Sequence, residues 1–182
     1  MKLKNLFGDL SYLFPGVQDK VGITGRVIVT KFGPDGRVVS RSINHNIVTD
    51  EGDALIADQM SDVPARAKVN NALGHIEVGT GYAGGGKAQT VLVTPTGSPD
   101  AMDATYPKIK GAFGAANDNV TQYQSTFAAG TLNATGINEA ALINNPVEAA
   151  ADVLAYAQVT PTVNAGLSDT LLILWEITYL GA

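Results

Sequence analysis

The segment Gly79–Lys87 carries the clearest chemical motif of the chain, because glycines recur through it and a lysine ends it. Its spacing fits a dinucleotide-binding loop and most of a phosphate-binding loop, in which backbone amides and a lysine hold phosphate. A phosphate-binding loop next needs Ser or Thr to hold magnesium, where this chain has Ala88, and both motifs need a helix directly after the glycines. Residues 89–94 instead have a strand-like sequence. We therefore expect a flexible glycine-rich loop, with nucleotide binding at residues 79–87 as an unfavoured alternative.

Residue types that hold metals or form catalytic centres are few and poorly spaced for such work. His45 and His75 are the only histidines and stand in no His-x-His or His-Glu-x-x-His spacing, and the chain has no cysteine. Asp50, Glu51 and Asp53 lack the alternating ligands of a calcium loop, so we interpret them as acids of a helix's first turn. No Gly-x-Ser-x-Gly elbow occurs, and carboxylate pairs across strands leave glycoside cleavage open without singling out a pair. We predict no catalytic residue, no metal site and no cofactor, hence a protein that is not an enzyme.

The composition favours a surface that other subunits cover. Only 16% of the 182 residues are charged, against roughly 25% in typical soluble domains. The net charge is -5, yet residues 1–41 hold seven bases against three acids, and residues 111–182 hold six acids and no base. The bases are scattered rather than clustered with aromatics, so we expect no nucleic-acid partner. The basic first segment either lies on an acidic partner or is simply solvated.

Residues 1–14 have the spacing of a short amphipathic helix, which Pro15 and Gly16 would end. The apolar face, which we predict to bind a partner surface, consists of Leu3, Leu6, Phe7, Leu10, Leu13 and Phe14. A helix this short is marginal alone, so the face must dock on the chain's own domain or on a neighbouring subunit. Too few bases flank it for membrane binding, Asp9 interrupts it as a signal peptide, and no apolar run could span a bilayer.

From Thr24 onward the sequence alternates with the period of β-strands. Residues 33–36, Gly-Pro-Asp-Gly, predict a hairpin turn, because proline presets the first turn position and Gly36 accepts a positive φ. Thr49 or Asp50 would cap a single helix, which carries Leu55, Ile56, Gln59 and Met60. The expected strands are Thr24–Lys31, Arg37–Val48, His75–Gly79, Gln89–Thr94, Thr121–Ala128, Ile137–Ile143, Val153–Thr160 and Thr170–Leu180.

This succession of short strands with one helix predicts a mainly β fold, an antiparallel β-sandwich or jelly roll. We divide the chain into an N-terminal arm, residues 1–23, and a β-sandwich domain, residues 24–182. Residues 95–120 hold several prolines and glycines without periodicity, and we expect them to form a long loop that is functional or held by a partner.

The last expected strand holds Trp175 and Glu176 side by side, so the two side chains face opposite ways. We expect Trp175 to pack in the core or between subunits. Glu176 then needs solvent or a basic partner, such as Arg26 or Arg41.

Several segments between residues 43 and 182 follow one another in a distinctive order. They are an Asn-x-Val-Thr strand leading into a helix (46–57), a strand ending in Gly-Thr-Gly (75–81), an aromatic strand (122–127), an Ile-x-Glu-Ala-x-Leu strand (137–142) and a last strand near the C-terminus (171–178). Read in this order, they resemble small virion proteins of tailed bacteriophages. The resemblance implies a β-sandwich structural subunit, with no catalytic residues to carry over, that decorates heads as cement or sits in tail tips and fibres.

We therefore expect a capsid cement (decoration) protein on the outer surface of a phage head. It would bind the major capsid protein and itself, as a homo-oligomer for which a trimer is the favoured state. The alternative is a tail-tip, collar or fibre protein that contacts a host receptor, with Tyr82 and Tyr106 as exposed loop residues that engage sugar.

Overall fold

The computed structural model describes residues 22–147 and 150–180. Within them the chain forms nine β-strands and one α-helix, which confirms the mainly β fold with one short helix. The elements are β1 (Gly22–Phe32), β2 (Val38–Val48), α1 (Asp50–Gln59), β3 (His75–Gly79), β4 (Asp100–Ala101), β5 (Lys108–Ile109), β6 (Val120–Phe127), β7 (Ala134–Ile143), β8 (Val153–Ala165) and β9 (Thr170–Leu180). The expected arm, residues 1–23, lies outside the described part except for Gly22 and Ile23, which already belong to β1.

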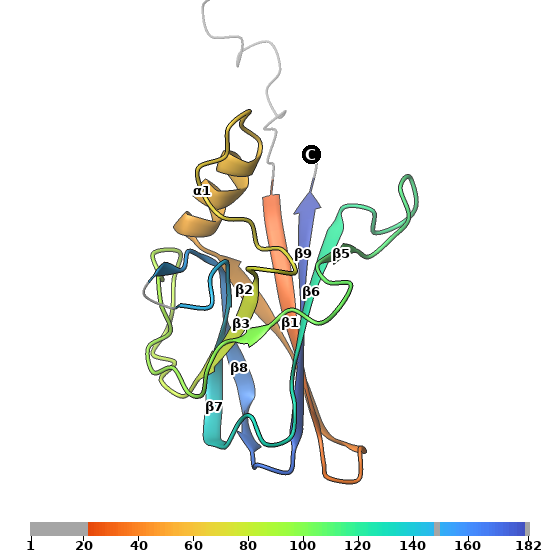
Figure 1. Cartoon of the computed structure of the whole chain (residues 1–182), viewed down its shortest axis with the longest axis vertical. Coiled ribbons are helices and arrows are strands. Elements are labelled where there is room, and N and C mark those ends of the chain that lie inside the picture. Colours follow the sequence, from red (N-terminus) through yellow and green to blue (C-terminus); the bar gives the residue numbers. More distant parts are fainter. Residues whose placement is uncertain (1–21, 148–149, 181–182) are drawn as a thin grey trace, which may run out of the picture.

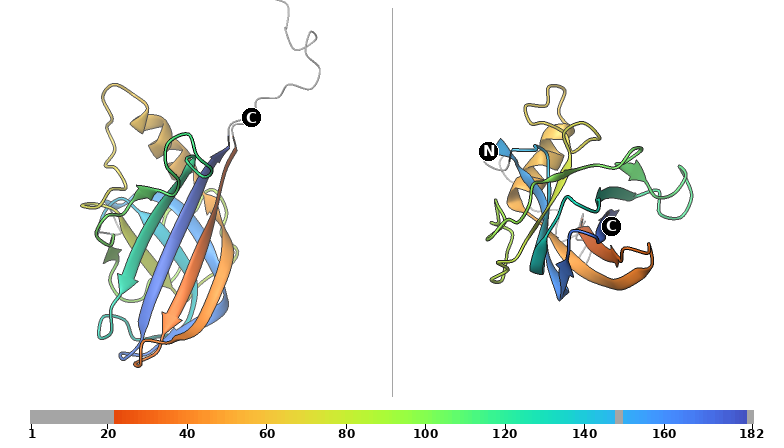
Figure 2. Two further views of the ribbon diagram at one scale, coloured as in Figure 1. Left: turned by 90° about the vertical axis from the view of Figure 1, so that its right-hand side faces the viewer. Right: turned by 60° about the horizontal axis from the view of Figure 1, so that its bottom comes forward.

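Hydrogen bonds join all nine strands into one sheet with the order β4-β3-β7-β8-β2-β1-β9-β6-β5. Every neighbouring pair is antiparallel. The sheet curls so that its two halves face each other (Figures 1 and 2). At the seam, Ser125 Oγ on β6 lies 2.6 Å from Asp100 Oδ2 and 2.9 Å from the Ala101 carbonyl oxygen, which brings β4 of the far edge against β6.

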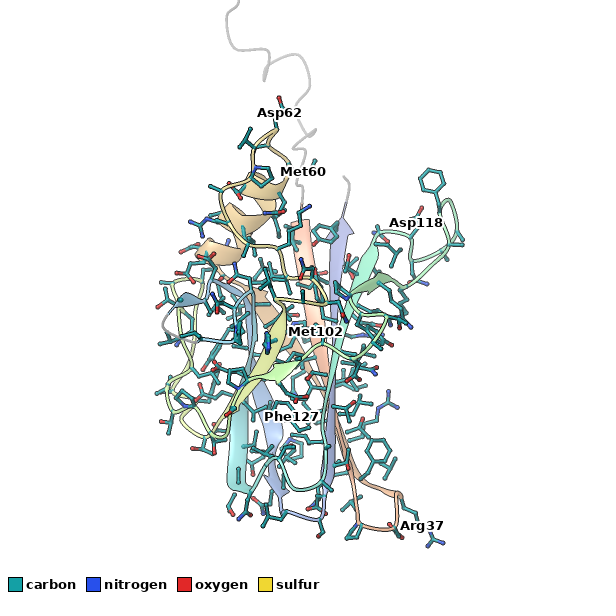
Figure 3. The ribbon with its side chains drawn as sticks, viewed as in Figure 1. Arg37, Met60, Asp62, Met102, Asp118 and Phe127 are labelled. Carbon is teal, nitrogen blue, oxygen red and sulfur yellow. The ribbon has the colours of Figure 1, made fainter. Side chains whose placement is uncertain are left out.

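The curled sheet encloses a main hydrophobic core to which both halves contribute. Trp175 is fully buried, so it packs inside this chain and not between subunits. On β9 the odd-numbered residues from Leu171 to Ile177 are buried, whereas Leu172 and Leu174 on the opposite face are only partly covered. β9 lies between β1 and β6, as a long apolar strand should. Met102 and Phe127 lie within the interior (Figure 3).

Local turn and cap chemistry produces the β1–β2 hairpin and helix α1 where the sequence predicts them. Gly36 adopts a φ of 73°, and its amide donates to the Gly33 carbonyl oxygen at 2.9 Å. The N-cap Thr49 accepts a hydrogen bond from the Gly52 amide at 2.9 Å. A Cβ on Gly52 would lie 2.1 Å from the Leu154 carbonyl oxygen, so glycine permits close packing of α1 on β8.

One expectation about the middle of the chain is wrong, and a second is met only in part, since residues 95–120 are irregular over most of their length. Residues 89–94 form no strand. Leu92 is buried there, whereas Val91 and Val93 are exposed, so the sequence alternates like a strand although the backbone is irregular. Residues 95–120 are not a structureless loop, because they contain β4 and β5 and form one side of the seam.

β8 continues to Ala165, five residues beyond its expected end at Thr160 and across Pro161. Proline lacks an amide donor, so it is tolerated only where a strand has no neighbour on that side. β2 pairs with β8 through Asn46, Ile47 and Val48 alone, which leaves the later part of β8 paired only with β7. The open side of β8 is what accommodates Pro161.

Candidate functional site

The glycine-rich loop folds around a carboxylate that the chain itself supplies. Glu139 lies on β7 and is fully buried. Its Oε1 accepts from the amides of Gly81 at 3.0 Å and Thr94 at 2.8 Å, and its Oε2 accepts from the amide of Val93 at 3.0 Å. These are the kind of donors that a phosphate group would use. Here Glu139 occupies them.

Two glycines of this loop, Gly79 and Gly85, are required by packing. A Cβ on Gly85 would lie 2.0 Å from Tyr156 Cε1, and a Cβ on Gly79 would lie 2.5 Å from Glu139 Oε1. Tyr156 donates its hydroxyl to Glu139 Oε2 at 2.7 Å, and Tyr82 stacks on its ring with centroids 5.8 Å apart. Burial, and next the hydrogen bond to Glu139, raise the pKa of the Tyr156 hydroxyl. The loop therefore covers a carboxylate–tyrosine pair.

Lys87, the lysine of the phosphate-loop motif, is held by the start of helix α1. Its ammonium group forms an ion pair with Asp53 and lies 3.9 Å from Asp50 Oδ1. The hydrogen bond to Asp53 raises the pKa of Lys87. Asp50 and Asp53 belong to the first turn of α1, together with Glu51, which confirms the interpretation of all three as helix-start acids.

Glu176 is another buried carboxylate, and its partners come from three strands or their ends. It accepts from Arg26 Nε at 2.7 Å, Lys110 Nζ at 2.9 Å and Gln122 Nε2 at 2.8 Å. Burial would raise the pKa of Glu176, but the hydrogen bonds from Lys110, Gln122 and Arg26 together lower it. Of the two expected partners, Arg26 is confirmed, whereas Arg41 is exposed on β2 and is not among these donors.

The two histidines lie in different settings. His45 lines a polar surface pocket of about 470 Å³ beside Arg26, Lys110 and Glu176. His75 is buried on β3, and its Nδ1 lies 3.0 Å from the Leu73 carbonyl oxygen. Within residues 22–147 and 150–180, no three His, Asp or Glu side chains gather in a way that could hold a metal ion. Glu176 in this pocket is already neutralised by two bases.

A projecting loop between β5 and β6 presents Phe113, which is fully exposed. The loop leaves the upper end of the molecule beside the labelled Asp118 (Figures 1 and 3). Its backbone is braced internally, because the Gly111 amide donates to the Asn117 carbonyl oxygen at 3.1 Å and the Gly114 amide donates to Asp118 Oδ2 at 2.9 Å. The chain therefore presents an exposed aromatic side chain on a braced backbone.

The residues expected to bind partners fall in different places. Leu3, Leu6, Phe7, Leu10, Leu13 and Phe14 lie outside the described residues. Tyr82 is not an exposed loop tip, since it stacks on Tyr156. Tyr106 is partly buried, with Lys108 Nζ 4.3 Å from its ring centroid. The sequence analysis missed Phe113, although an aromatic residue set among glycine and alanine in a proline-rich loop is a usable signal.

Glu139 was also missed as a structural centre. Its signal is a single acid among the apolar residues of a strand, which must find donors if the strand is buried. Sequence alone does not say that those donors lie some 45 residues away along the chain.

Comparisons with protein-family models, with curated proteins and with solved structures gave no match. In the described part of the chain, no helix has the length and apolar character needed to cross a bilayer.

Proposed function

We propose that this protein is a structural virion protein of a tailed bacteriophage, and that it acts as a capsid cement (decoration) protein. It would bind the major capsid protein on the outer surface of the head as a homo-oligomer, with a trimer as the favoured state. We class its curled sheet with β-sandwich subunits, since its two halves enclose a shared core. Two observations support the proposal together: the resemblance in segment order described above and the geometry of the exposed loops.

The observation that carries the proposal is Phe113 on its braced loop. Exposed aromatic residues are typical energetic anchors of protein interfaces. Fully burying such a ring contributes about 1.5–3 kcal/mol. Because the loop is fixed by its own hydrogen bonds, docking it costs less conformational entropy than docking a free loop.

The ionisable groups support adhesion over catalysis. A catalytic acid or base must reach a substrate proton, but the buried carboxylates of Glu139 and Glu176 already accept four and three hydrogen bonds from the chain. The apolar side chains that are most exposed among the described residues, Met60, Val63 and Phe113, lie in projecting loops. Covering these side chains in an interface removes apolar surface from water, which is favourable.

The copy number of the chain per particle tests the proposal. Quantitative mass spectrometry of purified particles gives the ratio of this chain to the major capsid protein. A ratio that matches the number of equivalent lattice sites on the head supports cement. A ratio comparable to that of tail proteins overturns it and favours the tail-tip, collar or fibre alternative.

A binding experiment with undecorated heads tests the role of Phe113. We expect Phe113→Ser to weaken binding by about tenfold to a hundredfold, which corresponds to loss of one buried ring. Val39→Ser is the matched control, because Val39 is an exposed apolar residue on the β1–β2 hairpin. If Phe113→Ser bound heads as tightly as the unaltered protein, Phe113 would not be an anchor of the interface, and the main support for the proposal would be lost.

A further inference from the structure

An apolar groove of about 320 Å³ lies between helix α1 and the sheet. Its lining is mostly apolar, with Leu55, Ile56, Val69, Tyr123, Leu154 and Tyr179, and it also includes Lys68. Ile56, Val69 and Tyr179 pack against the core cluster but are only partly buried. The hydrophobic core is therefore incompletely covered at this place.

One polar atom in the groove also lacks a partner. Gln59 Oε1 is buried and has no hydrogen-bond partner among the described residues, although its Nε2 donates to the Arg66 carbonyl oxygen at 3.1 Å. A buried acceptor of this kind needs a donor. We therefore expect an occupant of the groove to be largely apolar and to carry at least one hydrogen-bond donor for Gln59 Oε1.

Helix α1 ends beside the groove, and this end carries acids, although one base, Lys68, lines the groove itself. The last turn of α1 contains no basic residue, and Asp58 and Asp62 lie at or beyond it. The carbonyl end of a helix is itself partly negative, so positive charge is favoured there. Met60, whose side chain is largely exposed, stands between the two acids at the same end of the molecule (Figure 3).

The described chain starts beside this groove. β1 begins at Gly22, and Ile23 pairs with Tyr179, which lines the groove. Figure 1 shows the start of β1, the end of β9 and helix α1 at one end of the molecule. Residues 15–21 can span at most about 23 Å, enough to cross this end of the fold.

We infer that residues 1–14 of the same chain occupy this groove. Their apolar positions, Leu3 to Phe14, match the apolar part of its lining, and Lys2 and Lys4 bring positive charge, which the carbonyl end of α1 favours. A short tether raises the effective concentration of the segment to the millimolar range, which favours the chain's own segment over that of a second copy. The inference does not depend on the proposed function.

Disulfide trapping in the full chain tests the inference, because the native sequence has no cysteine to interfere. The test variant carries Leu6→Cys and Met60→Cys. The matched control carries Leu6→Cys and Phe113→Cys, since Met60 and Phe113 are both exposed, and the loops after α1 and after β5 project at the same end of the molecule (Figure 1). A third variant adds Leu10→Asp to the test pair, which places a charge on the apolar face.

We expect an intramolecular disulfide that forms about tenfold faster in the test pair than in the control, a difference that corresponds to about 1.4 kcal/mol of docking. Leu10→Asp should reduce the rate to that of the control. Equal rates in the test and control pairs would overturn the inference. A test-pair disulfide that links two chains, seen as a dimer on a non-reducing gel, would also overturn it and assign the groove to a neighbouring copy.

Discussion

Glu139→Gln should destabilise the protein by removing one acceptor from the buried end of the glycine-rich loop. All four polar contacts of the Glu139 side chain are hydrogen bonds that it accepts. Glutamine offers one acceptor oxygen and one amide group that only donates. The substitution keeps the shape of the side chain, so the loss is confined to hydrogen bonding.

The size of the effect follows from the contacts. With its oxygen in the place of Oε1, the glutamine keeps the hydrogen bonds from Gly81 and Thr94. The Tyr156 hydroxyl can rotate to accept from the new amide group, but the Val93 amide then faces another donor. A donor left in this way costs about 1–3 kcal/mol. At about 3 °C per kcal/mol for a protein of this size, we expect the Tm to fall by about 6 °C.

Thermal and urea unfolding followed by fluorescence of Trp175 measures the change, because Trp175 is the only tryptophan and is fully buried. Hydrogen exchange should also accelerate in residues 81–94. Asp62→Asn is the control, since it removes a carboxylate charge from an exposed position. An unchanged Tm together with unchanged exchange at residues 81–94 would refute the argument that Glu139 holds the loop.

Four further substitutions test the same packing and charge arguments. Gly85→Ala should cost about 1–3 kcal/mol in urea unfolding because the new Cβ overlaps a buried ring, whereas Gly86→Ala, with open space around it, should be neutral. Because folding lowers the pKa of Glu176, its ionised carboxylate stabilises the folded protein at pH values above 4.5, the pKa of this group in the unfolded chain. This stabilisation is lost as the pH falls from 4.5 through the lowered pKa of the folded protein. The urea midpoint of Glu176→Gln should therefore depend less on pH in the acid range than that of the unaltered protein. Burial raises the pKa of Asp100 above 3.8, so ionisation of this group weakens folding as the pH rises through the raised value. Asp100→Asn, whose amide can donate to Ser125 Oγ, should raise the urea midpoint at neutral pH.

The parts of the fold that the sequence predicts are those fixed by neighbours in the chain. Residues 33–36 form a hairpin turn because Pro34 and Gly36 set the backbone angles themselves. Thr49 caps α1 through an amide three residues away. Trp175 and Glu176 follow from strand alternation, which places one in the core and the other beside Arg26.

The parts that escape sequence analysis depend on contacts between distant segments. Val91 and Val93 alternate as in a strand, but the Val93 amide donates to Glu139, and the segment meets β3 only at its end, where the Thr80 amide donates to the Thr94 carbonyl oxygen. The same holds for the seam, where Ser125 meets Asp100 from a segment without periodicity. The composition correctly marks residues 79–86 as unusual. Glycine is needed at positions 79 and 85 because Glu139 and the Tyr156 ring lie against them, and both of these residues are distant in the sequence.

The division of charge along the chain has a different meaning in the folded protein than in the sequence. Residues 111–182 look like an acidic surface, yet each of their five described acids accepts a hydrogen bond or ion pair from within the chain. Three of these acids pair with bases from the first 70 residues, in Arg26–Glu176, Lys31–Asp169 and Arg66–Asp152. The opposite charges of the two halves therefore serve to hold the fold together. Since three of these acids are neutralised within the chain, a partner gains most from the exposed apolar groups, although Asp118, on the loop of Phe113, accepts only a backbone amide and keeps its charge.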